Sequence, residues 1–134
     1  IVHCGGDGAG QGAKMCNNMM LAVQMIGVCE GFRLAEDIGL DPEKLFEVSS
    51  QSSAQCWSLN TYCPYPGIMP NTPSSRGYRA GFSASLMLKD MALALDACDS
   101  HETKVDLARQ AYKLYQEHIA KSGGHGDFSG IFQS

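Results

Sequence analysis

The sequence predicts an all-α domain, and three observations lead to this fold class. Apolar residues recur at spacings of three and four over several long segments, as they do along one face of a helix. Residues typical of helix starts and ends separate these segments. The remaining long stretch is rich in proline and has no period. With 134 residues, 44 % of them apolar and 18 % charged, the chain can bury a core as one domain.

The longest helix is predicted from about Gln11 to Ile38. One face carries apolar residues at 4-3-4-3 spacing, namely Met15, Met19, Ala22, Ile26 and Cys29. The opposite side is also largely apolar, with Met20, Val23, Gly27 and Leu34. A helix that is apolar nearly all round is expected to be buried on several sides. Gly39 suits the left-handed position that ends such a helix.

A second helix is predicted to start at Asp41-Pro42-Glu43, which offers an N-cap, a first-position proline and an acidic first turn. It runs to about Ser49, and a short helix holding Trp57 follows a serine-rich break. Residues 60–81 contain four of the five prolines and are predicted to form an ordered loop. Loops of this length in compact domains are often functional.

Three further helices complete the predicted fold. The first spans about 83–98, with apolar residues at helical spacing. Thr103 and Asp106 match a capping box that would open the next helix, and Ser122-Gly123-Gly124 would end it. A short helix near residues 127–132 is last.

Composition excludes several classes of function. The net charge is −4 and no run of lysine or arginine occurs, so nucleic acid is not an expected partner. The most apolar segment, residues 19–29, is shorter than the ~20 residues that a membrane span needs. Histidines and cysteines show no metal-ligand spacing, so no metal site is predicted. The six cysteines are expected to be reduced thiols, because Cys16, Cys29 and Cys98 lie in core-like positions.

The glycine-rich opening, residues 8–13, matches the dinucleotide-binding pattern G-x-G-x-x-A, with Glu30 about 20 residues further on. That pattern requires a second strand before the acidic residue, whereas one unbroken helix is predicted here. The segment is therefore interpreted as a hinge at the helix start, where glycines permit close approach of another backbone or a ligand. A plain flexible linker remains the alternative.

Lys14 and Asn18 lie one turn apart on the same face near the start of the long helix. The positive end of the helix dipole and apolar surroundings would both favour the neutral amine of Lys14. A neutral amine can act as a general base, and the Asn18 amide can hold a substrate oxygen. From spacing alone, an exposed lysine beside an ordinary asparagine is the simpler interpretation.

Two motifs together resemble the β-hydroxyacid dehydrogenase family. Residues 8–18, GAGQGAKMCNN, resemble the family signature G-x-G-x-x-x-K-x-x-N-N. Residues 81–90, GFSASLMLKD, resemble its G-F-x-x-x-L-M-x-K-D motif. The proline loop, with Cys56-Trp57-Ser58 and the run from Asn60 to Met69, is similar to the branch that acts on 3-hydroxyisobutyrate, as is the ending from Asp127. Cys63 departs from the pattern, which has asparagine there.

The resemblance implies a helical C-terminal domain like that of 6-phosphogluconate dehydrogenase, with one long inter-domain helix. Residues 1–7 would be the tail of an N-terminal Rossmann domain, and residues 8–134 the helical catalytic and dimerisation domain. The implied reaction is NAD-dependent oxidation of 3-hydroxyisobutyrate to methylmalonate semialdehyde, in valine catabolism.

The resemblance also implies roles for individual residues. The catalytic pair would be Lys14, as general base, and Asn18, which positions it. Substrate contacts would come from Asn17, Phe82 and Asp90, and Lys89 would contact the cofactor. From the residues alone, Phe82 would instead be a hydrophobic staple, Lys89 and Asp90 a solvated charge pair, and Trp57 a packing residue.

The implied partners are a small hydroxy acid, the chain's own Rossmann domain and a second copy in a homodimer or higher homo-oligomer, with no nucleic acid or membrane. The implied location is the mitochondrial matrix. Two alternatives stay open. One is a helical dimerisation module without activity, and the other is a family relative that acts on another small β-hydroxy acid, such as a tartronate semialdehyde reductase.

Overall fold

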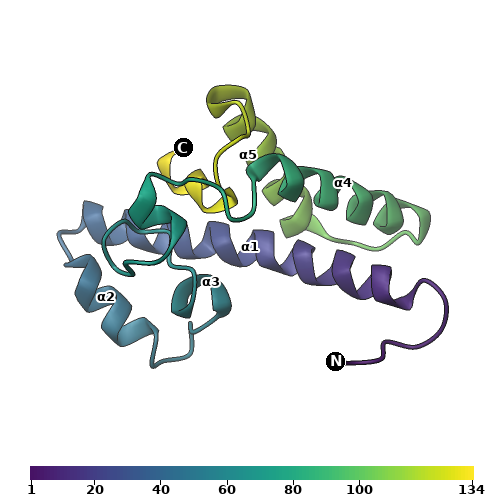
Figure 1. Ribbon diagram of the computed structural model, residues 1–134, viewed down its shortest axis with the longest axis horizontal. Coiled ribbons are helices and arrows are strands. Elements are labelled where there is room, and N and C mark those ends of the chain that lie inside the picture. Colours follow the sequence, from purple (N-terminus) through teal and green to yellow (C-terminus); the bar gives the residue numbers. More distant parts are fainter.

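The protein is all-α, as predicted. The computed structural model describes residues 1–134, and its only strand-like feature is an isolated bridge between Ser83 and Asp127. The elements, in chain order, are α1 (Ala9–Asp37), α2 (Pro42–Ser49), α3 (Trp57–Asn60), the 3₁₀ helix η1 (Pro73–Arg76), α4 (Ala84–Ser100), α5 (Asp106–Ser122) and the 3₁₀ helix η2 (Phe128–Gln133) (Figure 1).

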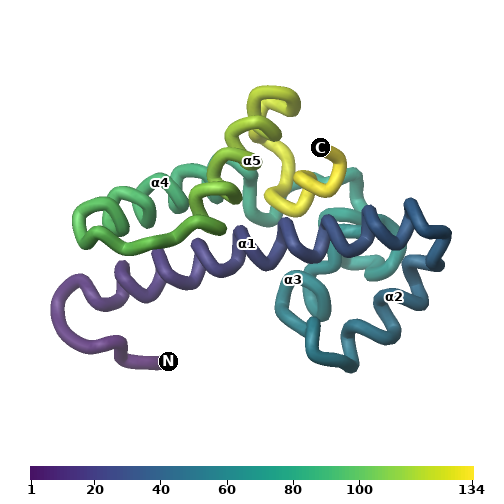
Figure 2. The backbone as a smooth tube through the Cα atoms, turned by 180° about the vertical axis from the view of Figure 1, so that it is seen from behind, coloured from purple at the N-terminus to yellow at the C-terminus, as the bar shows by residue number.

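Helix α1 is the axis of the domain. Helices α4 and α5 pack against each other and along one side of α1, while α2 and α3 lie on its other side (Figures 1 and 2). The 3₁₀ helix η2 contacts both α1 and α4. No helix is both long and apolar enough to cross a membrane.

The main core forms where α1, α4 and α5 meet. Its buried residues are Ala22, Met25, Ile26, Cys29, Ala84, Met87, Met91, Ala111, Tyr115, Phe128 and Ile131. The predicted inward stripe of α1 is thus correct for Ala22, Ile26 and Cys29. A smaller cluster of Phe32, Leu59 and Cys63 packs the loop and α3 against the C-terminal half of α1.

The expectation that α1 is buried on several sides is wrong within this chain. Met20 and Leu34, on the face opposite the core, are 54 % and 59 % exposed. The physical reason is that α4 and α5 cover only one side of the helix, and on the other side a cavity lies between Met20 and Trp57 of α3.

The helix ends follow the predicted signals with one exception. Gly39 has φ 76°, and the Asp41 carboxylate accepts a hydrogen bond from the Glu43 amide at 3.0 Å. The predicted capping box is wrong, because Val105 precedes α5 and no side chain caps that helix. The Thr103 amide instead donates to the Cys98 carbonyl, closing the end of α4.

All six cysteines are free thiols, as expected. Burial raises the pKa of Cys29 to about 12 and that of Cys63 to about 11, so both stay protonated at neutral pH. Cys16, which the pattern placed with the core residues, is exposed. It borders a cavity between α1 and the end of α4, where Ala94 and Cys98 line the other side.

Arg33 ties the C-terminal helix η2 to α1. Its guanidinium donates to the Ile131 carbonyl at 2.6 Å and to the Phe132 carbonyl at 3.1 Å. It also lies 5.8 Å from the centre of the Phe132 ring. These contacts satisfy carbonyls that a short helix leaves without partners.

The buried His118 predicts an acid-sensitive fold. Burial, and then the nearby Lys121 charge, lower the pKa of His118 below its ordinary value. His118 therefore binds a proton more readily in the unfolded chain than in the folded protein. The stability that the neutral, buried His118 provides is complete above about pH 6.5 and is lost as the pH falls through the lowered pKa. We expect the free energy of unfolding to decrease below pH 6.5, with a shallower decrease in His118→Asn.

The measurement is urea unfolding between pH 8 and pH 5. His125→Asn is the matched control, because His125 is exposed. An equal slope in the wild type and in His118→Asn would contradict the assignment.

Candidate functional site

Three predicted residues from two helices meet at one point. Lys14 and Asn18 lie one turn apart on α1, and Asp90 faces them from α4. The Asn18 amide nitrogen donates to Asp90 Oδ2 at 2.8 Å, and Lys14 Nζ lies 4.0 Å from Asp90 Oδ1. The Asp90 side chain is 16 % exposed and that of Lys14 is 62 % exposed. A largely covered carboxylate therefore holds an accessible amine.

Asn17 extends this polar cluster along α1. Its amide nitrogen donates to the Asn18 Oδ1 at 3.3 Å. Both ends of the Asn18 amide are thus occupied, one by Asn17 and the other by Asp90. The orientation of Asn18 is fixed from two sides, while the Lys14 amine keeps donor positions free toward solvent.

The expected apolar surroundings of Lys14 are wrong. Its side chain is mostly exposed, and its neighbours are the Asp90 carboxylate and the Asn18 amide. The reason is that α4 lies along the first turns of α1 but covers only one side of them. Met19 lines a cavity together with Ala94 of α4, whereas most of the Lys14 side chain stays exposed. Asp90, rather than burial, is what the structure places beside the amine.

Phe82 and Lys89 stand apart from this cluster. Phe82 precedes α4 and packs edge-on against Phe128, with ring centres 5.6 Å apart. Eight residues of helix separate Phe82 from Asp90, which is roughly 12 Å at 1.5 Å per residue. Lys89 is exposed and takes part in no ion pair. The structure thus brings together four of the six predicted site residues.

A cavity of about 480 Å³ adjoins the cluster between α1 and α3. It is lined by Asn17, Met20, Leu21, Gln24, Cys56 and Trp57. The Trp57 side chain is 47 % exposed, and its inner face stacks on Tyr62 with ring centres 4.6 Å apart. The sequence predicts that Trp57 is a packing residue. This prediction explains its stacking on Tyr62 but not the exposed part of its side chain. No local signal in the sequence separates the two roles, because Trp57 lies between Cys56 and Ser58 and outside any helical apolar stripe.

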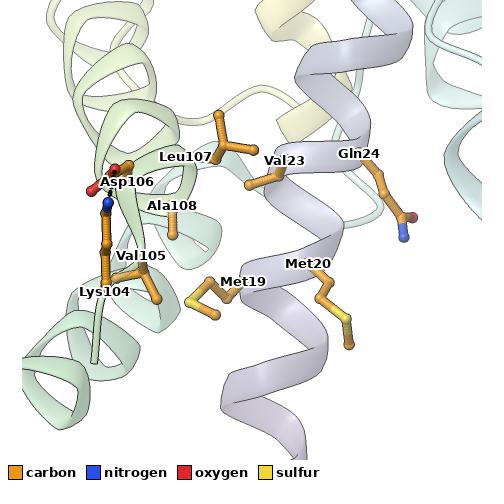
Figure 3. Close-up of a pocket in the computed structure, with 9 residues that line it drawn as sticks. All are labelled: Met19, Met20, Val23, Gln24, Lys104, Val105, Asp106, Leu107 and Ala108. Carbon is orange, nitrogen blue, oxygen red and sulfur yellow. Dashed lines mark ion pairs between the residues drawn. The ribbon is translucent and has the colours of Figure 1, made fainter. Parts of the chain in front are cut away.

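Another cavity lies elsewhere and contains none of the predicted site residues. It measures about 520 Å³ and is formed by α1 and the start of α5, where Met19 and Val23 face Val105 and Leu107 (Figure 3). The Lys104–Asp106 ion pair, 3.7 Å long, borders it. Its walls are mostly aliphatic, and its two charged residues, Lys104 and Asp106, pair with each other.

No group of three or more histidine, cysteine or acidic side chains is placed to hold a metal ion. The Gly8–Ala13 segment cannot form a nucleotide-binding turn after a strand, because α1 begins at Ala9 and continues through Glu30. The rejection of the dinucleotide pattern is therefore confirmed. For a nicotinamide cofactor, the chain offers Lys89, an exposed cation suited to a phosphate or a carboxylate.

A family model described as the NAD-binding domain of NADP-dependent 3-hydroxyisobutyrate dehydrogenase matches residues 8–134. The mitochondrial 3-hydroxyisobutyrate dehydrogenases of Homo sapiens and Bos taurus are each 44 % identical to the chain over 133 residues. That alignment covers 99 % of this chain and 40 % of each relative. The chain thus spans about two fifths of the length of these relatives.

Solved structures agree with this relationship. The 3-hydroxyisobutyrate dehydrogenase of Mycobacterium tuberculosis, described with L-serine, superimposes with a TM-score of 0.95 at 42 % identity, covering 99 % of this chain and 45 % of that one. The corresponding protein of Salmonella typhimurium gives a TM-score of 0.82 at 17 % identity, covering 94 % of this chain and 42 % of that one, which supports the fold alone. The helical C-terminal-domain fold predicted from the sequence is confirmed.

The Asn18–Asp90 hydrogen bond should couple the stability of α1 and α4. Asp90 is the charged partner of this pair, and the hydrogen bond is partly buried. A double-mutant cycle of Asn18→Ala and Asp90→Ala should therefore give a coupling energy of about 1 kcal/mol. The exposed Lys44–Glu47 pair on α2 is the control, and its coupling should stay below about 0.5 kcal/mol. Equal coupling in the two pairs, measured by urea unfolding, would contradict the geometry.

Proposed function

We propose that this chain is the helical C-terminal half of an NAD-dependent enzyme, since it belongs to the NAD-binding family of NADP-dependent 3-hydroxyisobutyrate dehydrogenase. The whole enzyme oxidises 3-hydroxyisobutyrate to methylmalonate semialdehyde. The observation that carries the proposal is the Lys14–Asn18–Asp90 cluster. It supplies an accessible amine beside a covered carboxylate, which is what proton transfer from a hydroxyl group needs.

Lys14 is the proton-transfer group of this proposal. Its Nζ accepts the proton that leaves the substrate hydroxyl and returns it in the reverse reaction. The Asp90 carboxylate, 4.0 Å away, lies beside the ammonium that results. When bound, NAD would supply the acceptor for the hydride on the carbon that bears the hydroxyl group.

The two asparagines position the reacting groups. Asn18, held by Asp90 and Asn17, keeps its amide beside the Lys14 side chain, where it orients the amine and the substrate oxygen. Asn17 also borders the cavity at α3, so it contacts a substrate placed there. The L-serine in the description of the Mycobacterium tuberculosis structure is a 3-hydroxy acid, which supports this substrate class for the present chain.

Phe82 and Lys89 complete the proposed site from the α4 side. The Phe82 ring borders the reacting centre, and Lys89 contacts the cofactor. Neither reaches the Lys14 cluster within this chain, so both roles require a substrate and cofactor that extend across the start of α4. Residues 1–7 join the chain to an N-terminal Rossmann domain that binds most of the NAD.

We also propose a homodimer or higher homo-oligomer in the mitochondrial matrix. The exposed apolar residues of α1, with Met20 and Leu34 as the largest, support self-association. The mitochondrial relatives from mammals and Dictyostelium discoideum support the location, whereas the mycobacterial relatives carry no such description.

A dimerisation module without activity explains less of the structure. Self-association requires apolar surface, but it does not require a covered carboxylate bound to an amine and an amide. A reductase of tartronate semialdehyde would use the same cluster, and the proline loop that forms the Trp57–Tyr62 wall favours the 3-hydroxyisobutyrate branch.

Replacing Lys14 tests the proposed chemistry. In the full-length enzyme that contains this chain, Lys14→Ala should lower kcat by about 10²- to 10⁴-fold, because it removes the proton-transfer group. NAD affinity, measured by calorimetry, should be kept. Lys113→Ala, which removes an exposed lysine from α5, is the control. A kcat near that of the wild type would remove Lys14 from this role.

A further inference from the structure

Asp127 is a completely buried carboxylate that receives five hydrogen bonds. Oδ1 accepts from the Tyr62 hydroxyl at 2.7 Å and from the amides of Gly81 and Phe82, each at 2.9 Å. Oδ2 accepts from the Ser129 amide at 3.0 Å and the Ser129 hydroxyl at 2.5 Å. No cation pairs with this group, so hydrogen-bond donors alone compensate its burial.

These donors come from three separate parts of the chain. Tyr62 follows α3, Gly81 and Phe82 precede α4, and Ser129 lies in η2. Backbone bonds reinforce the junction, because the Phe128 amide donates to the Phe82 carbonyl at 2.7 Å and the Asp127 amide donates to the Tyr78 carbonyl at 2.9 Å. Asp127 therefore connects the start of the proline loop, at Tyr62, to the segment that carries Phe82.

Tyr62 links the buried Asp127 carboxylate to the cavity beside the Lys14–Asn18–Asp90 cluster. The Tyr62 ring stacks on Trp57 at 4.6 Å with an interplanar angle of 20°, and the outer face of Trp57 lines the cavity that Asn17 also borders. Burial, followed by the hydrogen bond to Asp127, raises the pKa of Tyr62, so its hydroxyl keeps the proton that it donates. The aromatic wall is thus anchored at its buried end.

Gly81 provides independent support for this arrangement. A Cβ atom at position 81 would lie 2.7 Å from the Tyr62 hydroxyl oxygen, which is closer than real Cβ contacts permit. The hydrogen bond between Tyr62 and Asp127 therefore needs glycine at this position. Because the φ of Gly81 is not in the left-handed region, the requirement comes from space and not from backbone conformation.

We propose that Asp127 is a positioning residue for the substrate cavity. Through the Tyr62 hydroxyl it sets the place of the Trp57 wall, and through the Gly81 and Phe82 amides it sets the place of Phe82. One buried carboxylate then fixes both the Trp57 wall of the cavity and Phe82, which packs against Phe128 at the start of α4. This inference rests on the proposed function, in that the hydroxy acid occupies the cavity between Asn17 and Trp57.

The test uses Tyr62→Phe in the full-length enzyme. This change keeps the ring and removes only one of the five donors to Asp127, so the fold should be retained. We expect the KM for 3-hydroxyisobutyrate to rise about three- to tenfold, the size expected for one buried hydrogen bond. The KM for NAD and the Lys14-dependent kcat should change less than twofold. Gly81→Ala, which displaces the same hydroxyl, should reproduce this pattern.

Trp57 provides a second readout, because it is the only tryptophan of this chain. Its fluorescence, isolated by subtracting the signal of Trp57→Phe, should be quenched more easily by acrylamide in Tyr62→Phe and in Gly81→Ala. Tyr112→Phe, on the half-buried face of α5, is the matched control and should leave both readouts unchanged.

An unchanged hydroxy-acid KM, an equal rise in both KM values, or unchanged Trp57 quenching would each overturn the proposal. If the proposed function is wrong, the wild-type enzyme will not oxidise 3-hydroxyisobutyrate at all. This result separates failure of the proposed function from failure of the positioning role of Asp127. In that event Trp57 quenching still decides whether Asp127 positions the wall.

Discussion

The packing of α4 against α1 is the constraint on which the candidate site depends. On α1 the core residues Ala22 and Met25 continue, at helical spacing, the line on which Asn18 lies. On α4, Asp90 lies between the core residues Met87 and Met91. Burial of the methionines therefore sets the register of the two helices, and that register places the Asp90 carboxylate 2.8 Å from the Asn18 amide. A shift by one turn, about 5.4 Å, would separate the two groups.

The site combines a largely covered carboxylate, that of Asp90, with an accessible amine, that of Lys14. Asp90 is held in place by its position on α4 and by Asn18, whereas the Lys14 side chain remains open to a ligand. An exposed ion pair of this kind contributes about 0–1 kcal/mol to stability, so the fold depends little on it. In the proposed enzyme this half handles the proton, and the N-terminal domain presents the cofactor that accepts the hydride.

Sequence reasoning predicted what depends on neighbours along the chain. Helical spacing predicted the long helices, and helix-start residues predicted α2. The spacing of Lys14 and Asn18 placed both on one face, and the family motifs named Asp90. It could not predict contacts that depend on tertiary register, such as Asn18 with Asp90, or the Asp127 hydrogen bond to Tyr62, 65 residues away. It was wrong where tertiary packing overrides local pattern: Met20 and Leu34 are exposed, and Val105 precedes α5 in place of the Thr103 capping box.

The central claim is that the amine of Lys14 exchanges the proton of the substrate hydroxyl. Chemical rescue tests it most directly, since a small primary amine can occupy the space left by a shortened side chain. In the full-length enzyme carrying Lys14→Ala, methylamine should restore oxidation of 3-hydroxyisobutyrate in proportion to the concentration of its free base, while Asn18→Ala should show no such response. The absence of any rate increase in Lys14→Ala with methylamine, under conditions where substrate and NAD still bind, would contradict the account.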